Sequence, residues 1–276
     1  MSTTIRCSSL PSFVDCARRA AARILRPLVQ SAGYTLRDVP GHVAAMVGTA
    51  VHAAGEYTLR TKLTDGTLGS DTEALDRGMQ SFNDRVAEGA AWDATTASPS
   101  DAHTQIRKMT GAYRRYVAPK ITPIKVEDRL SAKWYSDPEF VLSGQADNFA
   151  AEPDAIRDLK TGAIRRPNWA QYGGYLLLAG AHGHDPAHFY EDFVKRVRPS
   201  KDQPEPETVS YDPQVAIAVA TEAMNRTIAQ IRDFRARVQT GSAPPELAFP
   251  ANPQSTLCSD KFCPARNTKF CREAMP

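Results

Sequence analysis

The chain has 276 residues, a length that suffices for one large domain with a buried core. Its formal net charge is +3. Hydrophobic residues make up 42% of the chain and charged residues 24%, a composition that excludes a chain disordered throughout. This mildly basic balance permits binding to nucleic acid without requiring it. No stretch reaches the roughly 18 apolar residues of a membrane span, and early arginines interrupt the core that a signal peptide would need. We therefore expect a cytoplasmic protein.

The first part of the chain is predicted to be helical. Apolar residues recur there at helical spacing, and Asp101 follows a Ser-Pro-Ser break as a candidate N-cap. The expected helices span residues 10–29, 41–60, 72–88 and 101–118.

The pattern changes to strands after residue 120. Alternating positions and a short apolar run predict a meander of three strands over residues 124–135, 140–149 and 155–159. A helix over 168–181, a strand over 188–197 and a polar loop over 199–206 follow. Asp212 then caps a long helix that ends before Gly241, and a proline-rich linker leads to a cysteine-bearing tail.

Three chemistry-bearing residues are expected to meet in the meander. Asp158 and Lys160 are two residues apart on one strand, so their side chains share a face. A hairpin places Asp147 beside Asp158, and a divalent cation such as Mg²⁺ relieves the repulsion between the two carboxylates. Such an ion activates water and stabilises a phosphoryl transition state, with Lys160 orienting the water, deprotonating it or stabilising charge. The alternative is a surface hairpin in which Asp158 and Lys160 form an ordinary ion pair.

These residues belong to five motifs that follow one another along the chain. The motifs are Gly48-x-x-x-His52, Val126-Glu127, Gly144-x-x-Asp147, Asp158-x-Lys160-Thr161-Gly162 and Gln171-x-x-x-Tyr175. In this order they resemble the RecB-like branch of the PD-(D/E)XK nucleases, over residues 8–271. The resemblance implies an α/β fold with a restriction-endonuclease-like core. A central mixed sheet would be flanked by helices, with a helical insertion and a cysteine-bound C-terminal tail.

The resemblance also implies a role for each motif residue. His52, Asp147, Asp158 and the backbone carbonyl of Leu159 would hold Mg²⁺ or Mn²⁺. Lys160 would act in catalysis with Asp158 and Asp147. Glu127 is either a further catalytic acid or a charge on the strand surface.

Three further residues are expected to position DNA. They are Gln171, Tyr175 and Thr161. Gln171 and Tyr175 lie one helical turn apart, and packing of their helix against the sheet is the alternative. We expect one domain over residues 1–276, with a helical insertion at 61–120, a nuclease core at 121–200 and a C-terminal helix with its cysteine tail at 210–276.

The cysteines predict a second metal site. Cys258, Cys263 and Cys271 lie close together, and clustered thiols in a reducing compartment favour metal ligation over disulfides. Nucleases of the AddB and CRISPR-associated kinds resemble this layout, which implies that Cys16 completes a [4Fe-4S] site. Four residues separate Cys258 from Cys263, more than in several members, so zinc and unligated thiols stay as alternatives. Cys7 is expected to be a small buried hydrophobe.

We therefore expect a Mg²⁺- or Mn²⁺-dependent deoxyribonuclease of the phage or CRISPR-associated type. It would be an exonuclease acting on DNA ends or single strands in recombination, repair or phage DNA processing, in the host cytoplasm if phage-encoded. The sequence has no ATPase phosphate loop, so DNA unwinding would need a helicase partner; a recombinase or single-strand-binding protein is a further expected partner. The alternatives are a non-cleaving DNA-binding protein of the same fold, in recombination or packaging, and a zinc–thiolate adaptor.

Overall fold

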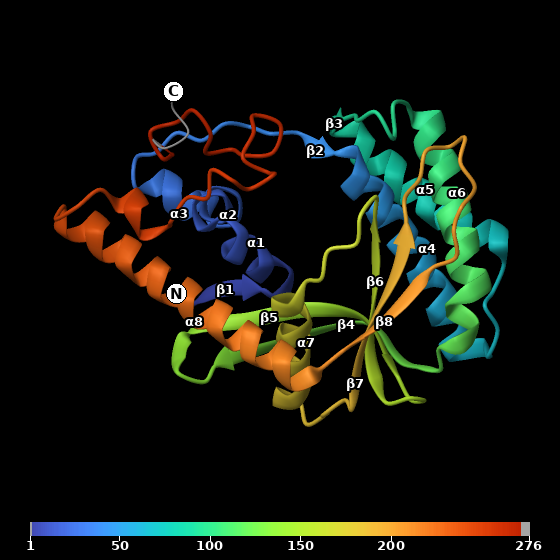
Figure 1. Cartoon of the computed structure of the whole chain (residues 1–276). Coiled ribbons are helices and arrows are strands. Elements are labelled where there is room, and N and C mark those ends of the chain that lie inside the picture. The colour runs from blue at the N-terminus through green and yellow to red at the C-terminus, as the bar shows by residue number, and fades with distance from the viewer. Residues whose placement is uncertain (1, 272–276) are drawn as a thin grey trace.

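A mixed β-sheet crosses the middle of the protein, with helices on both sides (Figure 1). The computed structural model describes residues 2–271. In this part of the chain the sheet order is β1-β5-β6-β7-β8, with β4 paired to β5. The strands are β1 (Thr3–Arg6), β4 (Pro123–Trp134), β5 (Asp137–Ala150), β6 (Ala155–Gly162), β7 (His188–Lys195) and β8 (Glu207–Tyr211). The expectation of an α/β protein with a central mixed sheet is confirmed.

Two groups of helices cover the sheet, and each has its own apolar core. One core joins α7, α8 and the N-terminal helices to the sheet, whereas the other joins α4, α5 and α6 to it (Figure 1). The helices are α1 (Leu10–Asp15), α2 (Ala17–Ile24), α3 (Arg26–Ser31), α4 (Val43–Asp65), α5 (Asp71–Ala87), α6 (Pro99–Tyr116), α7 (Trp169–Ala181) and α8 (Pro213–Thr240). Short elements complete the fold: η1 (Cys7–Ser9), η2 (Ala118–Lys120), η3 (Pro245–Ala248), and β2 (Gly41–His42) paired with β3 (Ala90–Ala91).

The predicted meander of β4, β5 and β6 is present, and its middle strand has an interrupted edge. β4 pairs with one edge of β5 along most of its length. On the other edge, β1 pairs with β5 up to Ser143, and β6 pairs with it from Asn148 onward. Within residues 2–271, residues 144–147 of β5 therefore have no strand neighbour on that edge. The polar residues described below gather around this opening.

One local expectation was wrong, and two strands were missed. The helix expected over residues 10–29 is three short helices. Cys16 is extended (φ −152°, ψ 100°) between α1 and α2, and Leu25 (φ −103°, ψ 28°) separates α2 from α3. Strands β1 and β8 were not expected, because each is short and depends on pairing with a strand far along the chain.

The long last helix follows its sequence signals. The Asp212 side chain accepts hydrogen bonds from the N–H groups of Gln214 and Val215, and Gly241 ends α8 at φ +64°. None of the helices in residues 2–271 is long and apolar enough to cross a membrane.

Candidate functional site

Three side chains from three elements converge on one point. His52 comes from α4, Glu127 from β4 and Asp147 from β5, and one ligand atom of each lies within 4.8 Å of the others. Nδ1 of His52 lies 3.2 Å from Oδ1 of Asp147. Two carboxylates and one imidazole suit a divalent cation, since carboxylates bind Mg²⁺ and Mn²⁺ and imidazole binds transition metals. The donor set therefore fits a divalent metal site, with Glu127 as its third member.

Glu127 occupies an unusual backbone conformation. Its φ of +53° lies in the left-handed region, which non-glycine residues adopt only at a cost of order 1–3 kcal/mol. The β4–β5 register places it opposite Asp147, and its carboxylate accepts a 2.6 Å hydrogen bond from Nε2 of Gln145. Because such strain gathers at functional sites, this conformation favours a functional role for Glu127 over a surface charge.

Asp158 and Lys160 form a buried pair beside these three residues. The Asp158 carboxylate is 1% exposed and contacts the Lys160 ammonium group. Asp147 also touches this strand, since its Oδ2 accepts a 2.6 Å hydrogen bond from the Leu159 N–H. Asp158 itself lies outside the group of three, so its predicted role as a metal ligand stays a prediction. The same holds for the Leu159 carbonyl.

The carboxyl groups of the site titrate at unusual pH values. Burial, with help from the Asp147 charge, raises the pKa of Glu127 to about 7. Burial also raises the pKa of Asp158 to about 6, although Lys160 opposes this shift. Burial acts in the same direction on Asp147, but His52 and Lys160 outweigh it and hold the pKa of Asp147 below its usual value. At Glu127 and Asp158 the nearby positive charge does not offset burial, and a divalent cation would supply more.

Lys160 keeps its charge at this position. Burial lowers the pKa of its ammonium group, but the neighbouring Asp158 and Asp147 carboxylates outweigh burial and raise the pKa above its usual value. Both carboxylates therefore favour the charged form of Lys160, which is the form that stabilises negative charge.

Mn²⁺ binding is expected to strengthen as the pH rises from about 5.5 to about 7.5, because the metal must displace protons from the carboxylates. Glu127, with a pKa of about 7, and Asp158, with a pKa of about 6, are protonated at the lower end of this range. Calorimetric titration at several pH values measures the effect, and proton release follows from repeating it in buffers of different ionisation enthalpy. Glu127→Gln should flatten the dependence. An affinity that does not change with pH in the wild type would contradict this expectation.

The glycine of the Gly-x-x-x-His motif lets α4 approach β6. A Cβ at Gly48 would lie 2.5 Å from Oγ1 of Thr161, so either the Thr161 side chain or the helix would have to shift for a larger residue. Thr161 and His52 line the same hollow, of about 790 Å³, together with Glu127, Asp147 and Lys160. This close approach is what holds His52 against β5.

Gln171 and Tyr175 lie behind the site on α7. Both are largely buried, and Nε2 of Gln171 donates a 2.8 Å hydrogen bond to the Tyr175 hydroxyl group. Tyr175 also lines a second hollow, next to the first. Their burial agrees with the alternative that this helix packs against the sheet. Contact of Gln171 and Tyr175 with DNA stays a prediction.

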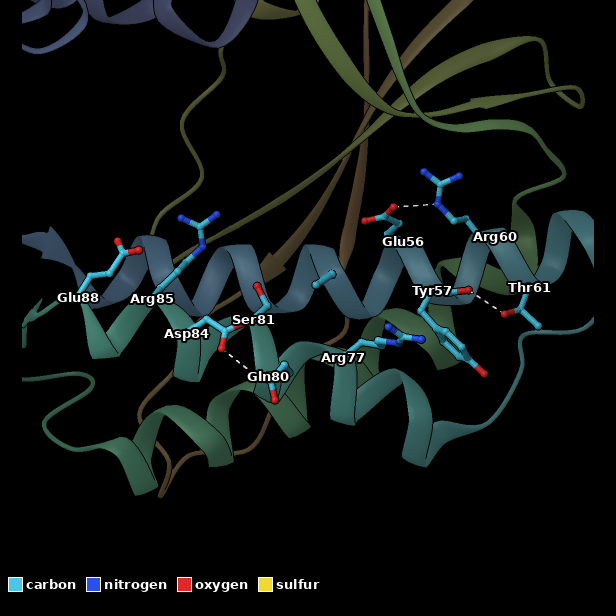
Figure 2. Close-up of a pocket in the computed structure, with 11 residues that line it drawn as sticks. Glu56, Tyr57, Arg60, Thr61, Arg77, Gln80, Ser81, Asp84, Arg85 and Glu88 are labelled. Carbon is cyan, nitrogen blue, oxygen red and sulfur yellow. Dashed lines mark hydrogen bonds and ion pairs between the residues drawn. The ribbon is translucent and has the colours of Figure 1, made fainter.

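A third hollow, of about 720 Å³, adjoins the site between α4 and α5 (Figure 2). It shares Ala53, Glu56, Ser81 and Arg85 with the hollow that contains the metal ligands. Its charges balance, because its lining has as many arginines as acids. These are Arg60, Arg77 and Arg85 with Glu56, Asp84 and Glu88.

The four cysteines predicted as ligands line one cavity. Cys16 lies at the break between α1 and α2, and the tail with Cys258, Cys263 and Cys271 returns to it after α8 (Figure 1). The Asn252 N–H lies 3.4 Å from Sγ of Cys16. Such N–H···S contacts are typical around cluster ligands.

The distances between the cysteine sulfurs can be compared with those in a zinc site. In a tetrahedral zinc site with Zn–S bonds of about 2.3 Å, the sulfurs lie about 3.8 Å apart. Within residues 2–271, the only group of three or more ligand atoms within 4.8 Å of one another is that of His52, Glu127 and Asp147. Among the described residues, no three of the cysteine sulfurs lie that close together, so the group that they would bind stays a prediction. Cys7 lies away from it in the core, where burial raises the pKa of its thiol.

The sequence pattern did not predict Arg6, Arg129 or Gln145 as residues of the site. Arg6 belongs to β1, the strand that the sequence pattern did not reveal, and Arg6 and Arg129 line the hollow that adjoins the metal ligands. Nε of Arg129 donates a 2.9 Å hydrogen bond to Oε1 of Gln145, the residue that bonds Glu127. The alternation of β4 was the available signal for Arg129, because it shares a face with Glu127.

Comparisons with known proteins bear on the fold. No protein-family profile matches the sequence, and no curated protein matches it. Among solved structures, the chain is similar to the crystal structure of a protein from Eubacterium rectale that carries the name "putative exonuclease". The TM-score is 0.58 at 11% sequence identity, over 92% of this chain and 86% of that chain. At this identity the likeness shows a common fold over nearly the whole length.

Proposed function

We propose that the protein is a metal-dependent deoxyribonuclease of the RecB-like PD-(D/E)XK kind. The observation that carries the proposal is the convergence of His52, Glu127 and Asp147 beside the buried pair of Asp158 and Lys160. The common fold with a protein named as an exonuclease supports it. The order of the five motifs supports the assignment to the RecB-like branch, with the whole chain as one nuclease domain.

Each residue of the site has a role in this proposal. His52, Glu127 and Asp147 would hold Mg²⁺ or Mn²⁺, with Asp158 and the Leu159 carbonyl as further ligands. The bound cation would lower the pKa of a water molecule and offset the charge of the phosphate. The Lys160 ammonium group, which lines the hollow and stays charged, would stabilise negative charge that develops on the phosphate.

The DNA-facing part of the proposal rests on the hollow around these ligands. Thr161 lines it beside Lys160 and would hydrogen-bond a phosphate oxygen, and Gln171 with Tyr175 would support the bound strand. We propose exonucleolytic action on DNA ends or single strands in recombination, repair or phage DNA processing. A helicase, a recombinase or a single-strand-binding protein would supply the DNA.

Digestion of end-labelled linear DNA and of circular DNA, with Mg²⁺ or Mn²⁺, tests the proposed activity. An exonuclease shortens the linear DNA, leaves closed circles intact and does nothing in EDTA. Binding without cleavage under every metal condition would replace the proposal with the alternative of a non-cleaving DNA-binding protein.

We further propose that Cys16, Cys258, Cys263 and Cys271 hold a [4Fe-4S] cluster. The convergence of the four thiols on one cavity supports a shared metal group, and the resemblance in cysteine layout favours the cluster over zinc. The cluster would be structural, because it would connect the α1–α2 break to the tail and close a very long loop of chain.

Cys263→Ser is expected to remove the visible absorption of the cluster and to lower the thermal midpoint by about 5 °C or more. The reason is that a site with three thiolates no longer closes the loop between the two parts of the chain. Iron and sulfide analysis, absorption spectra and thermal denaturation measure the effect. Cys7→Ala, which removes a thiol outside the cavity, should keep the iron. Wild-type protein that contains zinc and no iron would overturn the cluster.

A further inference from the structure

A row of polar side chains leads from the metal ligands along the sheet. On β4 and β5, residues two apart share a face, and the register places the residues of the two strands opposite one another. The row contains Glu127, Arg129 and Ser131 on β4, opposite Asp147, Gln145 and Ser143 on β5. Arg6 of β1 extends it, because Arg6 pairs with Ser143. Sheet pairing thus sets two arginines at a fixed place beside the metal ligands.

A hollow of about 490 Å³ lies over this row. Its lining contains two arginines, three serines and Tyr175, and no acidic residue. The hydroxyl-bearing serines are Ser8, Ser131 and Ser143. Ser8 and Gln145 also line the hollow of the metal ligands, so the two hollows adjoin.

The two arginines are available to an anion. Arg6 and Arg129 are both exposed, and within residues 2–271 neither has a carboxylate at ion-pair distance. The side-chain partner of Arg129 is the neutral amide of Gln145, at 2.9 Å. Guanidinium groups bind phosphate oxygens with paired, charge-assisted hydrogen bonds. Two such groups with three hydroxyls, and no acid among the lining residues of the described chain, suit an anion.

The hollow between α4 and α5 provides the contrast (Figure 2). There Arg60 forms a 2.8 Å ion pair with Glu56, and Asp84 and Glu88 offset the other arginines. Of the two hollows that adjoin the metal ligands, the one with Arg6 and Arg129 therefore attracts an anion more strongly.

We propose that the Arg6–Arg129 hollow binds a phosphate of a single DNA strand next to the phosphate cleaved at the metal site. This inference rests on the proposed nuclease function. Gln145 links the two places, since it bonds both Arg129 and Glu127. The hollow has the volume of a small-ligand pocket, which fits one nucleotide of a single strand.

Binding of a fluorescein-labelled single-stranded oligonucleotide in EDTA, at several salt concentrations, tests the inference without cleavage. Arg6→Ala and Arg129→Ala should each weaken binding about tenfold. Each should also reduce the slope of log affinity against log salt by about 0.7, which is one phosphate contact on a single strand. Arg6→Gln, which keeps the side-chain size, should act like Arg6→Ala. Oligonucleotides with and without a 5′-phosphate distinguish a terminal phosphate from an internal one.

Two exposed arginines provide matched controls. Arg115 on α6 lines none of the three hollows, and Arg77 lines the charge-balanced one. Arg115→Ala should leave binding unchanged, and Arg77→Ala should weaken it less than Arg6→Ala. Wild-type binding by the Arg6 and Arg129 variants, or an equal loss in Arg115→Ala, would overturn the inference. So would a larger loss in Arg77→Ala.

Cleavage assays on the same proteins separate this inference from the proposed function. Wild-type cleavage with Mn²⁺, combined with unaltered binding by the Arg6 and Arg129 variants, rejects the anion site and leaves the nuclease in place. Specific loss of binding in these variants, combined with no wild-type cleavage under any metal, rejects the nuclease and leaves the anion site.

Discussion

Asp147→Asn is expected to lower the rate of metal-dependent DNA hydrolysis about a thousandfold or more. Asp147 contacts His52, lies opposite Glu127 and accepts the Leu159 N–H, so it is central to the donor set. An amide cannot supply the negative charge that a divalent cation needs. Because such a cation stabilises the transition state by several kcal/mol, its loss corresponds to this factor. Single-turnover hydrolysis and calorimetric Mn²⁺ titration measure both consequences.

Asp128→Asn is the matched control for this substitution. Asp128 follows Glu127 on β4, but its carboxylate pairs with Lys125, at 3.2 Å, and not with the site. The control should keep wild-type hydrolysis and Mn²⁺ affinity. Wild-type activity in Asp147→Asn would reject the metal centre, whatever the control shows.

Gly173→Ala is expected to destabilise the protein by about 3 kcal/mol, in the upper range for overpacking. A Cβ at Gly173 would lie 1.8 Å from the backbone oxygen of Ala216, so α7 and α8 would have to separate. Both helices belong to the larger core, which α7 shares with the sheet behind the site. Urea denaturation measures the loss.

Gly180→Ala tests whether the effect is specific to this crossing. Gly180 lies on the same helix, and a Cβ there would meet no other part of the described chain within 4 Å, apart from its own helix backbone and chain neighbours. The control should be neutral or stabilise the protein by up to about 0.5 kcal/mol, because alanine favours helix more than glycine does. Similar losses in both variants would show that α7 tolerates neither alanine, and would contradict the close crossing at Gly173.

Much of the site could be predicted because it depends on local periodicity. Asp158 and Lys160 were expected on one strand, and the structure pairs them. His52 was expected on a helix upstream of Asp147, and the structure brings the two together. Alternation within a strand and spacing within a helix are properties of nearby residues, so they can be read from the sequence.

The rest of the site depends on contacts between distant parts of the chain. Arg6 reaches the site only because β1 pairs with β5, more than 130 residues later, in the register Arg6↔Ser143. Cys16 lies at a helix break that its own segment does not signal. The returning tail holds that region, as Nε of Arg18 donates a 2.9 Å hydrogen bond to the Phe249 carbonyl. Tertiary contacts override local propensity in both cases.

The left-handed backbone of Glu127 has a consequence for protein engineering. Glycine is the residue that this conformation favours, so a search for stabilising substitutions that considers folding alone would choose Glu127→Gly. That choice would remove the third member of the candidate metal site. At this position, a more stable protein and a working one would call for different amino acids.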